Sequence, residues 1–197
     1  ELKFKPLAVQ KSMPINLSRH FTNENKDSFK YDLFGNPIRW LAEDVSVTDD
    51  KGALVFVQPK VTRPDFWSPL SVKVVASRYF WGDMKKGERE NSVEQLIGRV
   101  ARFFARQAVK QGYFDENQAN IFRDELTAIC LNQIAVFNSP VWFNAGIQEY
   151  NKEAGGVSTF KWEAETDKII PAHKGEDRPQ CSACFIQSMA DNMESIM

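Results

Sequence analysis

The chain has 197 residues, 43% of them hydrophobic, and its 25 lysine and arginine residues nearly balance its 26 aspartate and glutamate residues, leaving a net charge of −1. This length supports one domain or slightly more, with a core large enough to need no metal or disulfide. The near-neutral charge argues against binding of a nucleic-acid polymer through bulk positive charge, and a mean hydropathy of −0.42 without a long apolar run argues against a membrane span.

The N-terminal region is predicted to form an extended arm followed by a β-hairpin. Its first 40 residues show little periodicity, and the opening segment has no apolar stretch of the kind that signal peptides carry. Two short β-prone runs, 45–47 and 54–57, flank the turn sequence Asp49-Asp50-Lys51-Gly52. Pro59 and Pro64 are interpreted as parts of a connector that follows the hairpin.

Three helices are predicted in the middle of the chain. The first follows Ser68-Pro69 and covers residues 70–80, although its valines leave a strand interpretation open. The second begins at Ser92, which opens a capping box, and its apolar residues recur at three- and four-residue steps until a stop at Gly112. The third begins at Asp115 and keeps the same period.

Four cations, Arg99, Arg102, Arg106 and Lys110, recur along the other side of the second helix. Their simplest interpretation is a solvated face with cations near the helix C-terminus, where the helix dipole favours them, and the alternative is a partner-binding patch. Cys130 lies beside the apolar stripe of the third helix and is interpreted as a buried structural residue.

The pattern changes after residue 135. Residues 136–143 are β-prone and are interpreted as a strand interrupted by Pro140, which would place the proline at an edge or a bulge. A polar insertion follows at 146–180, and excursions of this length are usually functional or mobile. Residues 181–186 are a short strand candidate, and a helix is expected to start near Asp191.

Cys181 and Cys184 form a C-x-x-C pair with several explanations. A thioredoxin-like motif would sit at a helix N-terminus, and a structural zinc ion needs four ligands, of which only Cys130 and two histidines remain. No metal site is therefore predicted. The pair could also be purely structural, or one thiol on a strand could face a pocket and act as a reductant. The odd count of three cysteines fits a reducing, cytoplasmic compartment.

Several motifs together resemble ribonucleotide reductases. Residues 138–146 (NSPVWFNAG) resemble the first strand of that family's barrel, and 181–186 (CSACFI) with 191–196 (DNMESI) resemble the second strand and the start of the effector-binding region. Three further segments resemble the N-terminal region of the long adenosylcobalamin-dependent type: Trp67-Ser68, 75–80 and 112–114. The resemblance spans residues 45–197, and it identifies the N-terminal portion of a class II ribonucleoside-diphosphate reductase, while leaving open whether diphosphates or triphosphates are reduced.

The resemblance implies an α/β fold, seen here as an α+β fragment, in which a mainly helical N-terminal region leads into the first strands of a ten-stranded α/β barrel. The expected parts are an extended arm and β-hairpin at 1–66, a helical domain at 67–135 and the start of the catalytic barrel at 136–197, with the polar insertion at 146–180. In this family adenosylcobalamin generates a cysteine thiyl radical, and a separate cysteine pair reduces the ribose.

The resemblance also implies roles for single residues. Cys184 matches the first member of the reducing pair, Ser139 the residue that meets the substrate's phosphate end, and Ala183 the residue whose backbone borders the substrate. Asp191, Asn192 and Met193 match the start of the effector site, where a deoxynucleotide selects the substrate. A local role is also open for two of them, because Ser139 could simply precede a bulge proline and Asp191 could cap a helix.

The expected partners of the full-length enzyme are a ribonucleotide substrate, a deoxynucleotide effector, a thioredoxin-like reductant and a second subunit in a homodimer. The second redox cysteine and the radical cysteine are expected downstream, so the fragment is not expected to turn over by itself. Two further functions stay open: a non-catalytic helical interaction module that uses the basic helix face, and a small thiol or zinc redox module built on the C-x-x-C pair.

Overall fold

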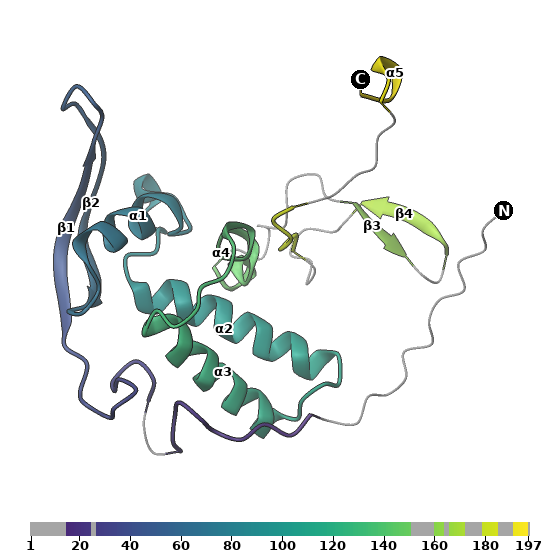
Figure 1. The fold of residues 1–197 in the computed structure, drawn as a ribbon, viewed down its shortest axis with the longest axis horizontal. Helices are drawn as coiled ribbons and strands as arrows, with labels where there is room; N and C mark the ends of the chain where they lie inside the picture. Colours follow the sequence, from purple (N-terminus) through teal and green to yellow (C-terminus); the bar gives the residue numbers. More distant parts are fainter. Residues whose placement is uncertain are drawn as a thin grey trace.

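The computed structural model describes residues 15–24, 27–150, 160–163, 166–171, 179–184 and 191–196. Helices and strands are mixed in an α+β arrangement, in which a long hairpin and three helices precede shorter elements (Figure 1). The strands are β1 (Trp40–Thr48), β2 (Leu54–Pro64), β3 (Phe160–Glu163) and β4 (Lys168–Pro171). The helices are α1 (Pro69–Arg78), α2 (Val93–Lys110), α3 (Glu116–Leu131), α4 (Ser139–Asn144) and α5 (Met193–Ile196), with 3-10 turns at Met84–Lys86 and Ile147–Glu149.

The predicted hairpin is confirmed and is longer than the sequence indicated. Strands β1 and β2 pair antiparallel, and the Asp49 carboxylate closes the turn by accepting hydrogen bonds from the backbone N–H groups of Lys51 and Ala53 at 2.9 and 2.8 Å. The connector predicted from Pro59 is wrong, because β2 continues to Pro64. A register shift opposite Asp44 accommodates Pro59, and the following N–H, of Lys60, bonds the Asp44 side chain at 2.9 Å.

The three predicted helices are confirmed, each begun by a side-chain cap. Ser68 caps α1, whose first turn contains a proline, and Ser92 caps α2 by accepting a hydrogen bond from the N–H of Glu94. Asp115 caps α3 by accepting from the N–H of Gln118 at 2.7 Å. Helix α2 stops at Lys110, just before Gly112, which has a φ of +77°.

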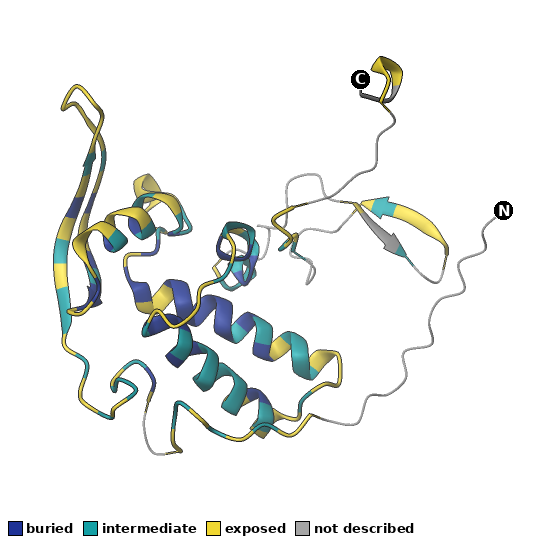
Figure 2. Cartoon of the chain, in the orientation of Figure 1, coloured by how far each residue is buried: buried dark blue, intermediate teal, exposed yellow. Residues whose placement is uncertain are grey.

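The core lies between the hairpin base and helices α1 to α4, as the buried positions in Figure 2 show. Helices α2 and α3 pack against each other, and α2 carries the most buried positions. Cys130 lies in this core with 4% of its surface exposed, which confirms its structural interpretation. None of the helices within the described ranges is long and apolar enough to cross a bilayer.

The described part of the N-terminal arm runs along α3. The Glu125 carboxylate accepts hydrogen bonds from the backbone N–H groups of Phe21 and Thr22 at 2.8 and 2.9 Å. Arg19 pairs with Asp124 at 2.9 Å. Residues 15–24 contain no helix or strand. Hydrogen bonds and an ion pair with side chains of α3 hold this segment against that helix.

The strand predicted at 136–143 is wrong. Its second half forms the short helix α4, capped by Asn138, whose side-chain oxygen accepts a hydrogen bond from the N–H of Val141 at 3.3 Å. Pro140 falls in the first helical turn, where its missing N–H leaves no helical hydrogen bond unmade. The cap and the proline position therefore outweigh the β-prone residues around them.

The region after residue 146 differs from the prediction where the structure describes it. The polar insertion contains a 3-10 turn at its start and the antiparallel pair β3–β4. The strand predicted at 181–186 is wrong for residues 181–184, which form no strand, whereas 185 and 186 lie outside the described residues. Helix α5 begins at Met193, close to the expected start. The described strands form two two-stranded sheets, and the ten-stranded barrel stays a prediction.

Candidate functional site

Ser139 is the first residue of α4, and its side chain faces the end of α1. The Ser139 hydroxyl lies 3.0 Å from the Tyr79 hydroxyl, at hydrogen-bond distance. The Tyr79 ring in turn stacks on Phe143, one helical turn further along α4, with ring centroids 5.2 Å apart and planes inclined by 17°. Tyr79, the residue immediately after α1, therefore contacts α4 both at its start, through Ser139, and near its end, through Phe143.

A buried ion pair fixes the C-terminal end of α4. The Arg99 guanidinium donates to the Glu90 carboxylate at 2.8 Å, and their side chains are 0% and 1% exposed. Arg99 also donates to the backbone carbonyls of Ala145 and Trp142. Glu90 accepts from the N–H of Trp81 at 2.8 Å. The solvated face predicted for Arg99 is therefore wrong, because its charge is neutralised and its N–H groups are paired inside the core.

Gly146 makes this arrangement possible. Its φ of +77° is a left-handed conformation, and an added Cβ would lie 2.7 Å from both the Arg99 Cγ and the Arg99 carbonyl oxygen. Only glycine combines this backbone conformation with so close an approach. The final glycine of the motif at 138–146 thus lets the chain turn directly over Arg99.

Two further arginines of the basic face of α2 are more exposed and are paired with a carboxylate. Arg102 and Arg106 both donate to Glu149, at 2.8 and 2.5 Å, and their side chains are 43% and 58% exposed. These pairs tie the 3-10 turn after α4 to α2. They leave little support for a separate partner-binding patch on this face, since both guanidinium groups already have a carboxylate.

The end of α4 contacts the residue that precedes the C-x-x-C pair. The Asn144 side-chain amide donates to the backbone carbonyl of Gln180 at 2.7 Å, which holds residues 179–184 beside α4. Cys181 is half-buried and packs against the core, whereas Cys184 and Ala183 are exposed. Ser139, Ala183 and Cys184 therefore come from segments that are joined by a direct hydrogen bond.

The three cysteines differ in their surroundings. All are free thiols, and burial raises the pKa of the Cys181 thiol. Deeper burial raises the pKa of Cys130 to about 11. Because thiolates and not thiols attack disulfides, the exposed Cys184 is the best placed of the three to react. Among the described residues, no group of three or more histidine, cysteine, aspartate or glutamate side chains could hold a metal ion.

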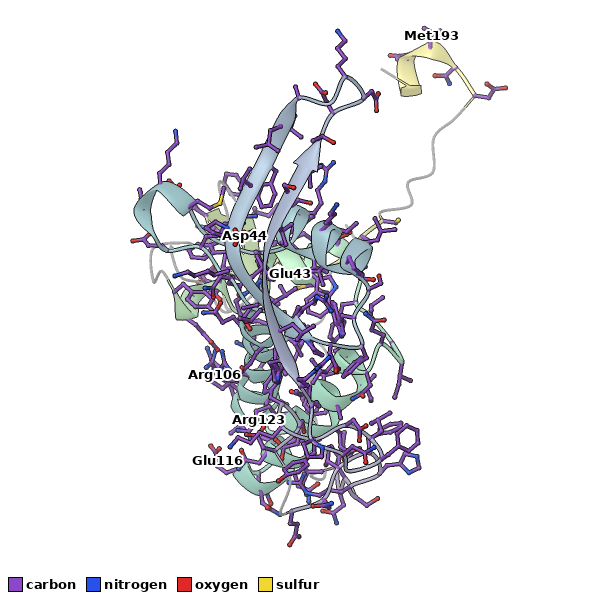
Figure 3. The ribbon with its side chains drawn as sticks, turned by 90° about the vertical axis from the view of Figure 1, so that its left-hand side faces the viewer. Glu43, Asp44, Arg106, Glu116, Arg123 and Met193 are labelled. Carbon is purple, nitrogen blue, oxygen red and sulfur yellow. The ribbon has the colours of Figure 1, made fainter. Side chains whose placement is uncertain are left out.

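Asp191, Asn192 and Met193 lie at the start of α5 and are exposed. Helix α5 stands apart from α4 in Figure 1, and Met193 stands apart from the body that carries Arg106 and Arg123 in Figure 3. Helix α5 therefore lies away from α4, the helix that carries Ser139. Their assignment to an effector site stays a prediction.

Tyr79, Glu90 and Gly146 were not singled out by sequence reasoning as parts of a site. Tyr79 lies in one of the resemblance segments, at 75–80, but its partner Ser139 is 60 residues away. Glu90 follows a turn and carries no local pattern. The Asn-Ala-Gly end of the 138–146 motif could have indicated a left-handed conformation at Gly146. It could not have indicated that Gly146 packs against Arg99.

The sequence of this chain is similar to a described protein family and to several named proteins. Residues 65–149 match the family described as ribonucleotide reductase, all-alpha domain. Three similar proteins are each named vitamin B12-dependent ribonucleotide reductase. The protein of Rhodopirellula baltica is 40% identical over 161 residues, covering 80% of this chain and 15% of that protein. Those of Streptomyces clavuligerus and Streptomyces avermitilis are each 35% identical, covering 80% and 81% of this chain and 14% of each protein.

These findings support a ribonucleotide reductase N-terminal portion, and the chain spans about 15% of the length of the relatives that it matches. Tyr79, Glu90, Arg99, Ser139 and Gly146 all fall within the matched all-alpha domain. Residues 179–184 lie beyond the matched region, so the hydrogen bond from Asn144 to Gln180 joins that region to the segment that carries the C-x-x-C pair.

Proposed function

We propose that this chain is the N-terminal portion of a class II, adenosylcobalamin-dependent ribonucleotide reductase, which converts ribonucleotides to deoxyribonucleotides. The observation that carries this proposal is similarity over 80% of the chain to proteins named vitamin B12-dependent ribonucleotide reductase. Two contacts support that role: Ser139 at the start of α4 bonds Tyr79, and Asn144 at the end of α4 bonds the segment that carries Ala183 and Cys184.

Cys184 is proposed as the first member of the reducing thiol pair. In the overall reaction two thiols and the ribose C–OH give a C–H bond, water and a disulfide, so that the two electrons and two hydrogen atoms come from the cysteines. The partner thiol is expected from a cysteine outside this sequence. The exposure of Cys184 supports this role, because the thiol must reach both the substrate and an external, thioredoxin-like reductant.

Ser139 and Ala183 are proposed to contact the substrate. The Ser139 hydroxyl can donate to a phosphate oxygen, and the exposed residue Ala183 can border the nucleotide beside Cys184. Asp191, Asn192 and Met193 are proposed as the start of a site for a deoxynucleotide effector. Assembly as a homodimer and a cytoplasmic location are part of the same proposal, which covers diphosphate and triphosphate substrates alike.

Adenosylcobalamin would supply the radical when bound to the full-length enzyme. The described residues do not fit a corrin site: their single histidine, His20, packs edge-on against Phe21 with ring centroids 4.6 Å apart. The residues that hold the cofactor are therefore expected elsewhere in the parent protein.

The test is adenosylcobalamin-dependent ribonucleotide reduction by the full-length parent protein with a dithiol reductant. Cys184→Ser should abolish multiple turnover, because no disulfide can form at the sugar. The matched control Cys181→Ser should retain activity. Equal activity of Cys184→Ser and the wild type would show that Cys184 is not part of the mechanism. Loss of multiple turnover in Cys181→Ser alone would assign the reducing role to Cys181 instead.

A further inference from the structure

We propose that Tyr79 is a positioning residue for the substrate's phosphate end and acts by orienting the Ser139 hydroxyl. The inference rests on the proposed function, because it takes Ser139 as a substrate contact. It adds a residue from the end of α1, 60 positions earlier in the chain, to a site otherwise built from α4 and residues 179–184.

The Tyr79 oxygen is held in place from two sides. Its backbone N–H caps α1 by donating to the carbonyl of Val75 at 2.9 Å, which fixes where the side chain leaves the helix. Its ring stacks on Phe143 with centroids 5.2 Å apart. The ring is half-buried, with Trp67, Cys130 and other apolar residues around the same hollow of about 170 Å³. The hydroxyl therefore reaches Ser139 from a nearly fixed point.

The direction of the hydrogen bond follows from the ligand. A hydroxyl has one hydrogen to donate and two lone pairs, and the oxygens of an ionised phosphate accept hydrogen bonds. If Ser139 donates its hydrogen to a phosphate, its oxygen must accept the hydrogen of Tyr79 across the 3.0 Å contact. Tyr79 thereby selects the rotation of the Ser139 hydroxyl that points its hydrogen away from Tyr79 and toward the ligand, and donation to Ser139 strengthens the outer bond.

Tyr79→Phe isolates this role, because phenylalanine keeps the ring that stacks on Phe143 and removes only the hydroxyl. Losing one neutral hydrogen bond should weaken nucleotide binding about 2- to 10-fold. The turnover number should change less than about 2-fold, since the interaction is made equally in the ground and transition states. The matched control is Tyr113→Phe, a tyrosine that is 44% exposed and remote from α4 in sequence.

The experiment is a double-mutant cycle in the full-length parent protein with Tyr79→Phe, Ser139→Ala and the double variant. Binding of CDP and of CTP is measured by titration calorimetry, and reduction is measured in parallel. If Tyr79 acts through Ser139, the loss caused by Tyr79→Phe should be present with Ser139 and absent in the Ser139→Ala background. A purely structural effect of Tyr79 would persist in that background.

The outcomes separate the inference from the proposed function. Wild-type affinity in Tyr79→Phe, or an equal loss in the Ser139→Ala background, overturns the role of Tyr79 while leaving reduction intact. Coupled losses of binding without any cobalamin-dependent reduction would support the Tyr79–Ser139 pair and overturn the proposed reductase. A parent protein that binds neither CDP nor CTP would overturn both.

Discussion

Gly146 and Gly112 offer a matched pair of residues, because both have a φ of +77° and only one is crowded. Gly112→Ala should cost about 1–2 kcal/mol of unfolding free energy, the usual cost of a left-handed conformation for an L-residue. Gly146→Ala should cost about 1–3 kcal/mol more, because its Cβ would press on Arg99 and Phe103. Urea unfolding of both variants measures the difference, and equal losses would refute the close packing over Arg99.

The three thiols should react in an order set by burial. Cys184 is exposed and should be alkylated first by iodoacetamide at pH 8, followed by Cys181, whose pKa is raised by partial burial. Cys130, with a pKa raised to about 11 by burial, has about one thiolate in a thousand at this pH and should react only after unfolding. Peptide mapping by mass spectrometry gives the order, with Cys184→Ser as the control. Faster labelling of Cys181 than of Cys184 would contradict their environments.

At the scale of elements, the contact between the N-terminal arm and α3 should depend on pH through Glu125. Burial tends to raise the pKa of this carboxyl, but hydrogen bonds from Phe21, Thr22 and His20 outweigh it, so the pKa lies below its ordinary value of 4.5. A carboxyl with a lowered pKa stabilises the folded contact above its unfolded pKa, and this stabilisation is lost as pH falls through the folded value.

The arm should therefore stay protected at neutral pH and become cleavable as the pH falls through the lowered pKa of Glu125. Limited proteolysis with pepsin across pH 2 to 5 would report this release, with cleavage expected within residues 15–24. Glu125→Gln should remove most of the pH dependence, because an amide does not titrate in this range. An arm of the wild type that is equally resistant at all these pH values would show that Glu125 does not control the contact.

The elements also show what the sequence could reveal. Local signals predicted the β1–β2 hairpin and the starts of α1, α2 and α3, because caps and turn residues act within a few positions. The same signals are present at α4, where Asn138 and Pro140 open a helix, but the β-prone residues around them favour a strand by pattern. Local signals could not predict the ion pair between Arg99 and Glu90, because the helical period places Arg99 on a polar face. Glu90 lies beside Arg99 only in the folded chain. The contact between Tyr79 and Ser139 is likewise tertiary.

At the scale of the whole molecule, the hairpin β3–β4 differs from the core in how its side chains are covered. Phe160 and Ile169 are 66% and 74% exposed, whereas Val100 on α2 is 1% exposed. An isolated two-stranded hairpin is marginally stable in water unless it packs on something else. The chain is therefore expected to consist of one cooperative core within residues 27–150 and a weakly protected hairpin beyond it.

Native-state hydrogen exchange of the 197-residue chain tests this division. Amides in the middle of α2 should exchange only through global unfolding, with protection factors of about 10⁴ or more for a domain stable by at least about 5 kcal/mol. Amides of β3 and β4 should be protected less than about 10-fold. The paired amides of β2 near Val61, which is fully buried, serve as a control for a hairpin that does pack on the core. Protection of β3–β4 equal to that of α2 would mean that this hairpin belongs to the same cooperative unit and that its apolar side chains are covered in solution.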